Sequence, residues 1–222
     1  MKRKEALLQD ILKTEIVTLA CDDPKIKPEM MWGVVSGCIA LGLQVYYIDY
    51  DLQFSSLVQN LPDEEFNKLK DLTILQPRDE ALADSVITLA SESMRTGGLI
   101  ILDSINTIQN LLSIHPSSSD LKVANHRSAI LINAYQQLAR FYSKSIIILN
   151  VTRSRPRPNQ GNSISWERKV VGGRMTRFKS DAILFAREFP SHSESTTRGI
   201  RITAESASGT EFGGKLHDEY EL

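Results

Sequence analysis

The segment Cys21–Pro28 follows an apolar run and has the position and length of a phosphate-binding loop. A working Walker A loop, GxxxxGK[ST], needs glycines whose backbone N–H groups wrap phosphates, a lysine for charge, and a hydroxyl for Mg²⁺. Lys27 stands at the position of the motif lysine. Cys21 and Ile26 replace the two glycines, and Pro28 replaces the hydroxyl residue. The loop therefore keeps the charge and loses the other contacts.

Two acidic residues, Asp22 and Asp23, lie inside the same loop. Each places a negative charge beside the position of a phosphate, where like charges repel at close range. Pro28 also removes one backbone N–H from the segment. Lys27 is then either a remaining phosphate ligand or a solvated lysine next to the start of a helix. We expect ATP to bind weakly or not at all, and an active enzyme with this loop would be an ATPase.

An apolar run, Leu99–Leu102, brings Asp103 and Ser104 to the end of a predicted strand. This has the form of a Walker B segment, whose aspartate holds Mg²⁺ in nucleotide hydrolases. Asp49 and Asp51 end another predicted strand. A carboxylate there can orient an attacking water as a general base. The alternative for these acids is a polar cap on a strand end.

The stretch from Arg153 to Lys179 is strongly basic. It holds eight arginines and lysines against one acid, a local charge of +7 in a chain whose net charge is −1. Arginines separated by Pro and Gly, with Trp166 among them, match a surface that contacts phosphates and stacks on a base. Solvated surface charge is the alternative. The basic residues are Arg153, Arg155, Arg157, Arg168, Lys169, Arg174, Arg177 and Lys179.

Other chemistry is excluded by residue spacing. The four histidines are scattered without metal-ligand spacing, and the two cysteines suit neither a CxxC zinc site nor a disulfide framework. A reducing compartment is the simple interpretation. The start of the chain lacks the apolar core of a signal peptide, and no window approaches about 18 uninterrupted apolar residues. We therefore expect a cytoplasmic protein with no membrane partner.

Short apolar runs alternate with helix-period segments along the 222 residues. This pattern is typical of an α/β fold with a mostly parallel central sheet flanked by helices. The composition, 41% hydrophobic and 24% charged, suits one domain with a sizeable core. Helices are predicted over 1–14, 28–41, 77–95 and 121–142. Strands are predicted over 15–21, 44–49, 72–75, 99–103, 145–150, 182–187 and 199–205, with a short one near 211–212.

Residues 152–165 carry no apolar period and are rich in Arg, Pro, Asn, Ser and Gly. They are predicted to form a long loop, the first half of a basic region over 152–179. Glycine-rich turns separate the last strands, which predicts an antiparallel section at the C-terminal end. No internal repeat or linker marks a second domain, so residues 1–222 are expected to form one unit.

In order and spacing, these segments resemble the core domain of RecA/RadA-type recombinases, most closely the short archaeal RadB-like paralogues. The resemblance covers about residues 15 to 222. It implies a RecA-type P-loop NTPase core, with ATP and single-stranded DNA as the family's ligands. The segments that carry it are the altered phosphate loop, Tyr46–Asp51, Leu99–Ser104, Ser145–Asn150, the basic region, and Gly172-Gly173 before a later strand.

The resemblance also implies roles for single residues. Asp51 stands where the family has its catalytic glutamate. Lys27, Asp103 and Ser104 stand at nucleotide-binding positions, and Asp103 also at the Mg²⁺ position. Because the family's sheet places the strands side by side, we expect Asp49, Asp51 and Asp103 to cluster, with one pKa raised by the other charges. The implied DNA contacts are Arg153, Arg155, Arg157, Trp166, Arg168, Lys169, Arg174 and Arg177.

Departures from the family set the functional expectation. Val151 replaces the glutamine that would couple nucleotide state to DNA binding, and we expect no N-terminal DNA-binding domain and no polymerisation motif before the core. We expect an accessory DNA-repair and recombination protein that binds single-stranded DNA, a RadA-type recombinase, or both, and does not hydrolyse ATP. The alternatives are a weak DNA-dependent ATPase and a structural subunit of a recombinase-paralogue heteromer whose partner supplies the nucleotide site.

Overall fold

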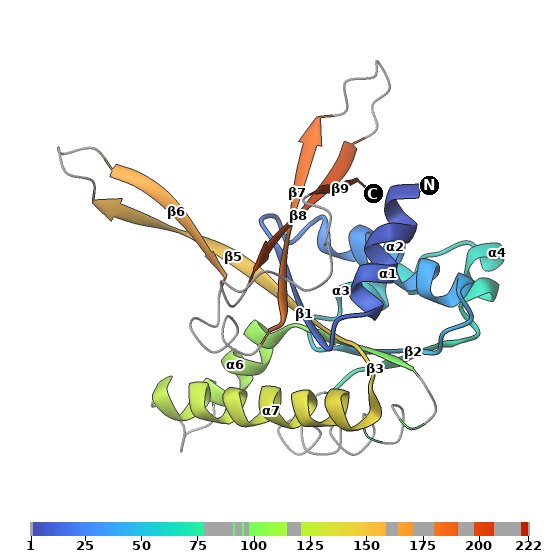
Figure 1. Cartoon of the computed structure of the whole chain (residues 1–222), viewed down its shortest axis with the longest axis horizontal. Coiled ribbons are helices and arrows are strands. Elements are labelled where there is room, and N and C mark those ends of the chain that lie inside the picture. Colours follow the sequence, from blue (N-terminus) through green and yellow to red (C-terminus); the bar gives the residue numbers. More distant parts are fainter. Residues whose placement is uncertain are drawn as a thin grey trace.

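The computed structural model in Figure 1 describes most of the chain. The described residues are 2–77, 91, 95, 98–114, 121–158, 164–170, 180–190, 198–206 and 219–221. They form an α/β arrangement around one sheet, in the strand order β3-β2-β4-β5-β1-β7-β8-β9, with β6 paired to β5 outside this path.

Parallel pairs build the middle of the sheet. The strands β1 (Ile16–Cys21), β2 (Val45–Asp49), β3 (Leu72–Leu75), β4 (Leu99–Asp103), the first part of β5 (Ile146–Pro158) and β7 (Ala182–Pro190) run in the same direction. Antiparallel pairs then join β7 to β8 (Arg198–Ser206) and β8 to β9 (Glu219–Glu221). The predicted parallel sheet and the predicted antiparallel C-terminal section are both confirmed.

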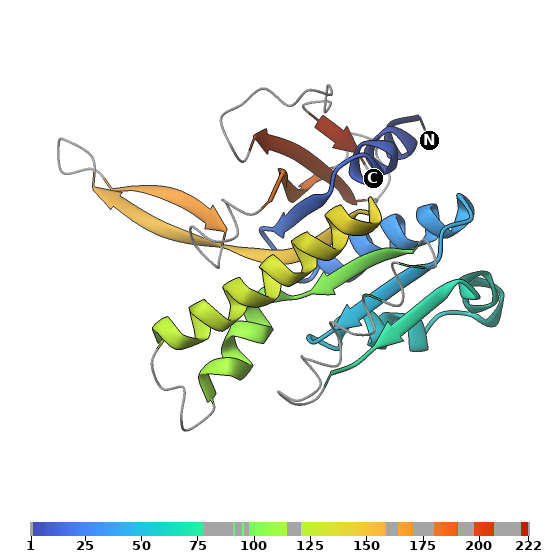
Figure 2. The same cartoon turned by 60° about the horizontal axis from the view of Figure 1, so that its bottom comes forward.

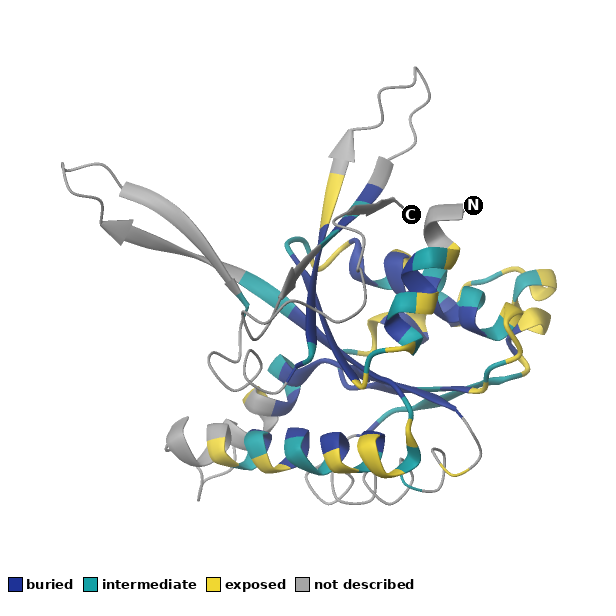
Figure 3. Cartoon of the chain, in the orientation of Figure 1, coloured by how far each residue is buried: buried dark blue, intermediate teal, exposed yellow. Residues whose placement is uncertain are grey.

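Helices cover both faces of this sheet (Figures 1 and 2). One face packs on α1 (Lys2–Leu12), α2 (Lys27–Ala40) and α3 (Gln53–Gln59), and the other on α6 (Ile105–Ile114) and α7 (Leu121–Tyr142). Neighbouring strand residues serve opposite faces: Ile101 belongs to the first core cluster, while Ile100 and Leu102 belong to the second. Burial on both faces explains the unbroken apolar runs of the central strands, which Figure 3 shows in dark blue.

Most predicted helices are present where the structure describes them. The helix α7 has the predicted bounds, and α1 and α2 lie within a few residues of theirs. A short helix α4 (Asp63–Phe66) and a turn of 3-10 helix η1 (Asn67–Leu69) precede β3. The predicted helix over 77–95 lies outside the described residues except at 77, 91 and 95, and the predicted strand near 211–212 lies wholly outside them. No helix in the described ranges is long and apolar enough to cross a membrane.

The prediction of a long loop over residues 152–165 was wrong at 152–158 and 164–165, while residues 159–163 lie outside the described residues. Here β5 continues to Pro158, and β6 (Ile164–Val170) pairs with it antiparallel from Thr152↔Val170 to Pro158↔Ile164. Each strand of a two-stranded ribbon has one unpaired edge. Pro156 and Pro158, which have no N–H, can therefore be part of β5 here, whereas a central strand rarely accommodates proline. We call residues 152–158 and 164–170 the basic hairpin; Figure 1 shows it extending away from the layers of the fold.

Candidate functional site

The parallel strands bring the predicted acidic residues to one edge of the sheet. Asp49 ends β2 and lies directly opposite Asp103, which ends β4. Asp51 follows two residues after β2, and Lys27 begins α2, the helix after β1. The expected clustering of the three carboxylates is confirmed: Asp49 lies opposite Asp103, and Asp51 and Asp103 contact the same lysine. They meet because parallel strands end at the same edge of the sheet.

Lys27 joins two of these carboxylates. Its ammonium nitrogen donates a hydrogen bond to Oδ1 of Asp103 at 2.5 Å and another to Oδ2 of Asp51. The side chain is 1% exposed and Asp103 is fully buried, while Asp51 is 15% exposed. The sequence left two alternatives for Lys27, a solvated lysine and a phosphate ligand. The structure fits neither, because the side chain is buried and its charge is paired with two carboxylates. We call Lys27, Asp51 and Asp103 the buried charge triad.

Hydroxyl groups complete the bonding of the triad. The Tyr47 hydroxyl donates to Oδ2 of Asp103 at 2.7 Å. The other oxygen of Asp51 accepts bonds from Ser104 at 3.2 Å and from Thr107. The peptide bond between Asp103 and Ser104 is cis. Ser104 thus lies at the site, but its hydroxyl bonds a carboxylate of the protein.

The pKa values of the triad follow from burial and from the shared lysine. Burial raises the pKa of Asp103 to about 6, against the opposing attraction of Lys27. A raised carboxylate pKa was expected in this cluster, but the expected cause was wrong: burial outweighs repulsion by Asp51. Burial also acts to raise the pKa of Asp51, but the hydrogen bonds from Lys27 and Thr107 outweigh it and lower that pKa. Burial acts to lower the pKa of Lys27, and its two carboxylate partners outweigh this and raise it.

Asp49 belongs to a separate contact. Its Oδ2 accepts bonds from the backbone N–H and the hydroxyl of Ser55, at 2.7 and 2.6 Å, which ties β2 to the helix α3. Its Oδ1 has no hydrogen-bond partner among the described residues. Asp49 is a cap between strand and helix, the alternative considered from the sequence.

The loop between β1 and α2 uses three of its backbone donors within the protein. The N–H of Asp22 donates to the carbonyl of Ala186 at 3.2 Å, that of Ile26 to the carbonyl of Asp23 at 3.3 Å, and that of Lys25 to the Asp23 carboxylate at 2.9 Å. Pro24 and Pro28 have no N–H to offer. A phosphate-binding loop needs these groups unpaired and pointing at the ligand.

These contacts do not fit a resident Mg-ATP. The cation that a triphosphate would need is paired with two carboxylates, and Asp103, the carboxylate expected to hold Mg²⁺, accepts a bond from Lys27. Nor do the described residues contain a group of three or more His, Cys, Asp or Glu side chains arranged to hold a metal. Burial raises the pKa of the Cys21 thiol to about 12, so this residue is not a nucleophile at neutral pH.

The basic hairpin carries six of the eight predicted DNA contacts. Arg153, Arg155 and Arg157 occupy alternate positions of β5, which share one face of a strand. Lys169 lies opposite Arg153 on the same face. Trp166 and Arg168 belong to the other face, opposite Pro156 and Ser154. Arg174 and Arg177 lie outside the described residues.

Sequence reasoning missed the residues that support these sites. Tyr47 and Thr107 bond the triad from the middle of a strand and from a helix, and neither position has a motif that marks it. Thr152 and Arg187 contact Asp22, far apart from it in sequence. The alternation of arginines at 153, 155 and 157 has the period of a strand, and this signal could have revealed the hairpin.

Comparison with known proteins adds no relatives. No protein-family model matches the sequence, and no curated protein matches it. The function is therefore inferred from the residues and their geometry.

Proposed function

We propose that this chain is an accessory DNA-repair and recombination protein that binds single-stranded DNA through the basic hairpin and does so without ATP hydrolysis. The observation that carries the proposal is the basic hairpin itself, with Arg153, Arg155 and Arg157 on one face of β5. The basic hairpin follows the other segments in the order that resembles RecA/RadA-type recombinases. This resemblance supports a RadA-type recombinase as a further partner.

Spacing along the hairpin suits a phosphate backbone. Alternate residues of an extended strand are about 6.8 Å apart, so the three arginine positions form a row along one face of β5. A row of positive charges of this kind can follow the phosphates of a strand of nucleic acid. Contacts of this kind position a nucleic acid without reading its bases, so little sequence preference is expected.

Trp166 and Arg168 on the opposite face favour a single strand over a duplex. An aromatic side chain binds a base by stacking only where the base is splayed out of a helix, and an arginine beside it meets the adjoining phosphate. A two-stranded ribbon is also one of the elements that fit a major groove. Duplex DNA is therefore the comparison that tests this preference.

The buried charge triad speaks against the rival function, a weak ATPase. A catalytic Asp51 would have to accept a proton from water, but it already accepts bonds from Lys27, Ser104 and Thr107, and these lower its pKa. A group so paired is a poor general base at neutral pH. DNA binding by this chain is accordingly proposed to be independent of nucleotide.

The test is fluorescence anisotropy with a labelled single-stranded oligonucleotide across a salt series, with and without Mg-ATP, and with duplex as competitor. Affinity should fall with salt with a log–log slope of about −0.7 per phosphate neutralised, and ATP should change nothing. Changing Arg153, Arg155 and Arg157 together to alanine should make the slope shallower by about 1 to 2 units.

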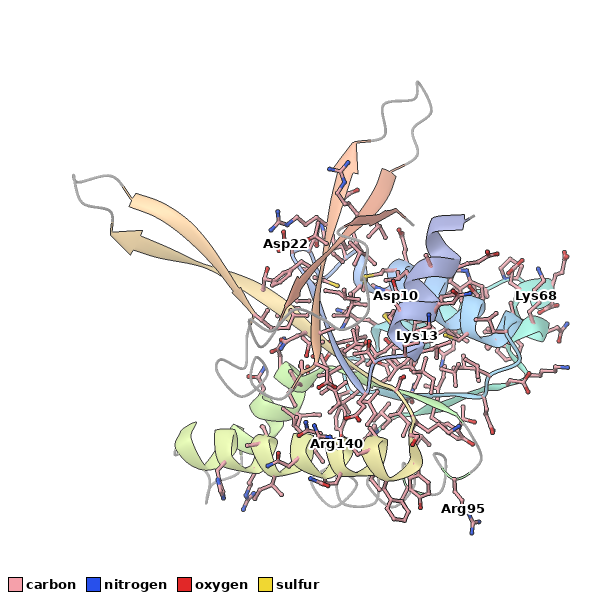
Figure 4. All side chains as sticks on the ribbon, in the orientation of Figure 1. Asp10, Lys13, Asp22, Lys68, Arg95 and Arg140 are labelled. Carbon is pink, nitrogen blue, oxygen red and sulfur yellow. The ribbon has the colours of Figure 1, made fainter. Side chains whose placement is uncertain are left out.

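A matched control removes the same charge elsewhere. Lys13, Lys68 and Arg140 are exposed and lie on other elements than the hairpin, as their labels in Figure 4 show. Their triple alanine variant should keep the wild-type slope and affinity. Equal effects of the two triple variants, or tighter binding to duplex, would overturn the proposed single-stranded site.

A further inference from the structure

The strand order places the end of β1 between β5, which leads into the basic hairpin, and β7, which pairs with β8. In the sheet, β1 lies between β5 and β7, and its last residue, Cys21, pairs with Val151 on one side and Ala186 on the other. Thr152, the next residue of β5, forms the first pair of the basic hairpin with Val170. The hairpin therefore leaves the sheet at the level where β1 ends.

Asp22 is the first residue beyond β1 and bonds both neighbours. Its Oδ1 accepts a hydrogen bond from the Thr152 hydroxyl at 2.8 Å. Its Oδ2 pairs with Nε of Arg187 on β7 at 2.9 Å, and its side chain is 15% exposed. Figure 4 labels Asp22 at this junction. One carboxylate thus links the base of the basic hairpin to β7.

The described apolar cluster at the same junction is small. Among the described residues, Val170 packs against a cluster of three buried residues, Ala20, Ile183 and Phe185. The neighbouring clusters on the two faces of the sheet are far larger. Within the described part of the chain the apolar contact at the hairpin base is small, so the polar contacts of Asp22 contribute to its orientation.

We propose that Asp22 is a positioning residue, which fixes the direction in which the basic hairpin leaves the sheet. The inference rests on the proposed function, since the hairpin matters for binding only if it is the nucleic-acid site. The loop that wraps phosphates in nucleotide-binding proteins here holds the nucleic-acid-binding element in place. An acidic residue beside a phosphate is a defect in an ATP site, but it suits this task because a carboxylate accepts from a hydroxyl and an arginine at once.

Trp166 reports the orientation without any ligand. The chain has two tryptophans, so a Trp32→Phe background leaves Trp166 on β6 as the single probe. In this background Thr152→Val removes the hydroxyl donor to Asp22 and keeps the shape of the side chain. The expected result is a lower steady-state anisotropy of Trp166, because the hairpin base moves more freely.

The control is Thr14→Val, which removes a comparable bond from the Thr14 hydroxyl to the Asp10 carbonyl at 2.8 Å. Both valine variants should lower the melting temperature by similar amounts, and only Thr152→Val should change Trp166. A Trp166 anisotropy in Thr152→Val equal to that of its parent overturns the positioning role. This holds even if Asp22→Ala fails to fold, since Thr152→Val keeps the carboxylate.

Binding separates this inference from the proposed function. Thr152→Val should weaken binding of a labelled single-stranded oligonucleotide by about 2- to 10-fold, the equivalent of one hydrogen bond, with an unchanged salt slope. Asp22→Ala combined with Thr152→Val should add little to Asp22→Ala alone, because both remove the same contact. If the wild type binds no oligonucleotide, the proposed function fails, and the Trp166 anisotropy still decides the role of Asp22. If wild-type binding is normal and Thr152→Val changes neither readout, the positioning role fails and the function stands.

Discussion

The ammonium nitrogen of Lys27 lies 2.5 Å from Oδ1 of Asp103, and both side chains are buried. By sequence, the two residues were matched to a Walker A lysine and a Walker B aspartate, which in a nucleotide hydrolase face a phosphate and a metal ion. Direct pairing between them, together with Asp51, gives each charge a partner within the protein. These three charges are thereby paired without a ligand.

Lys27→Met should lower the free energy of unfolding by about 3–5 kcal/mol, because it leaves two carboxylates at the site without their cation. Chemical denaturation at pH 7 measures this. Lys25→Met, two residues earlier and exposed, should change stability by less than about 0.5 kcal/mol. A lysine kept for phosphate binding would give the reverse picture, with little loss of stability in Lys27→Met.

Asp103→Asn should be neutral or mildly stabilising at pH 7 and should change the pH dependence of stability. The pKa of Asp103 is raised from 3.8 to about 6 in the folded state, so the folded protein binds this proton more tightly than the unfolded chain. Its contribution is full below about pH 4 and is lost as pH rises through 6, a difference of about 3 kcal/mol. Wild type should therefore lose stability over this range relative to Asp103→Asn.

Denaturation of both proteins at several pH values between 4 and 8 checks this sign. Asp51 acts in the other direction, since its lowered pKa gives stability that is lost as pH falls below its ordinary value. Because both proteins contain Asp51, its effect largely cancels in the difference. A clear loss of stability in Asp103→Asn at pH 7 would show instead that Lys27 needs both charges.

The sheet could be predicted because its strands are buried on both faces. Runs such as Leu99–Asp103 and Ile146–Asn150 are nearly all apolar, and only a central strand of an α/β sheet buries every residue. The basic hairpin could not be predicted in this way, because residues 152–158 contain no apolar residue to mark a strand. The alternation of arginines at 153, 155 and 157 indicates a strand there, but the pairing partner β6 is not specified by the local sequence.

The positions of the site residues were also predictable, but their state was not. The carboxyl edge of a parallel sheet gathers Asp49, Asp51 and Asp103 whatever they bind. Whether Lys27 points toward solvent or turns inward depends on the free energy of burying an ion pair, which needs Tyr47, Ser104 and Thr107 in place. Tyr47 is on β2, Ser104 lies between β4 and α6, and Thr107 is on α6, so no single local pattern reveals them.

Mg-ATP at millimolar concentration should leave the melting temperature unchanged. A ligand at 100 times its Kd would stabilise the native state by about 2.7 kcal/mol, which a thermal shift detects readily. The expectation follows from the paired Lys27 and from the three loop N–H groups, of Asp22, Lys25 and Ile26, that bond within the protein. Calorimetry at low temperature gives the independent measurement. A micromolar Kd that Lys27→Ala abolishes would restore the weak ATPase as the better proposal.

Trp166→Ala should weaken oligonucleotide binding by about 1–3 kcal/mol if a base stacks on the indole ring. The salt slope should stay at the wild-type value, because stacking neutralises no phosphate and releases no counterion. By the strand register, Trp166 and the arginines at 153, 155 and 157 belong to opposite faces of the hairpin, so this variant tests one face alone. Affinity loss without a change of slope therefore assigns the second face a contact of its own.

Trp166→Phe is the matched variant, since it keeps an aromatic ring and should recover most of the lost affinity. Equal losses in the alanine and phenylalanine variants would point to the indole N–H rather than to stacking. No loss in either, together with a reduced slope in the triple arginine variant, would confine the nucleic acid to the face of β5 that carries Arg153, Arg155 and Arg157. Binding would then depend on phosphate contacts alone, and such a surface has no means of preferring a single strand over a duplex.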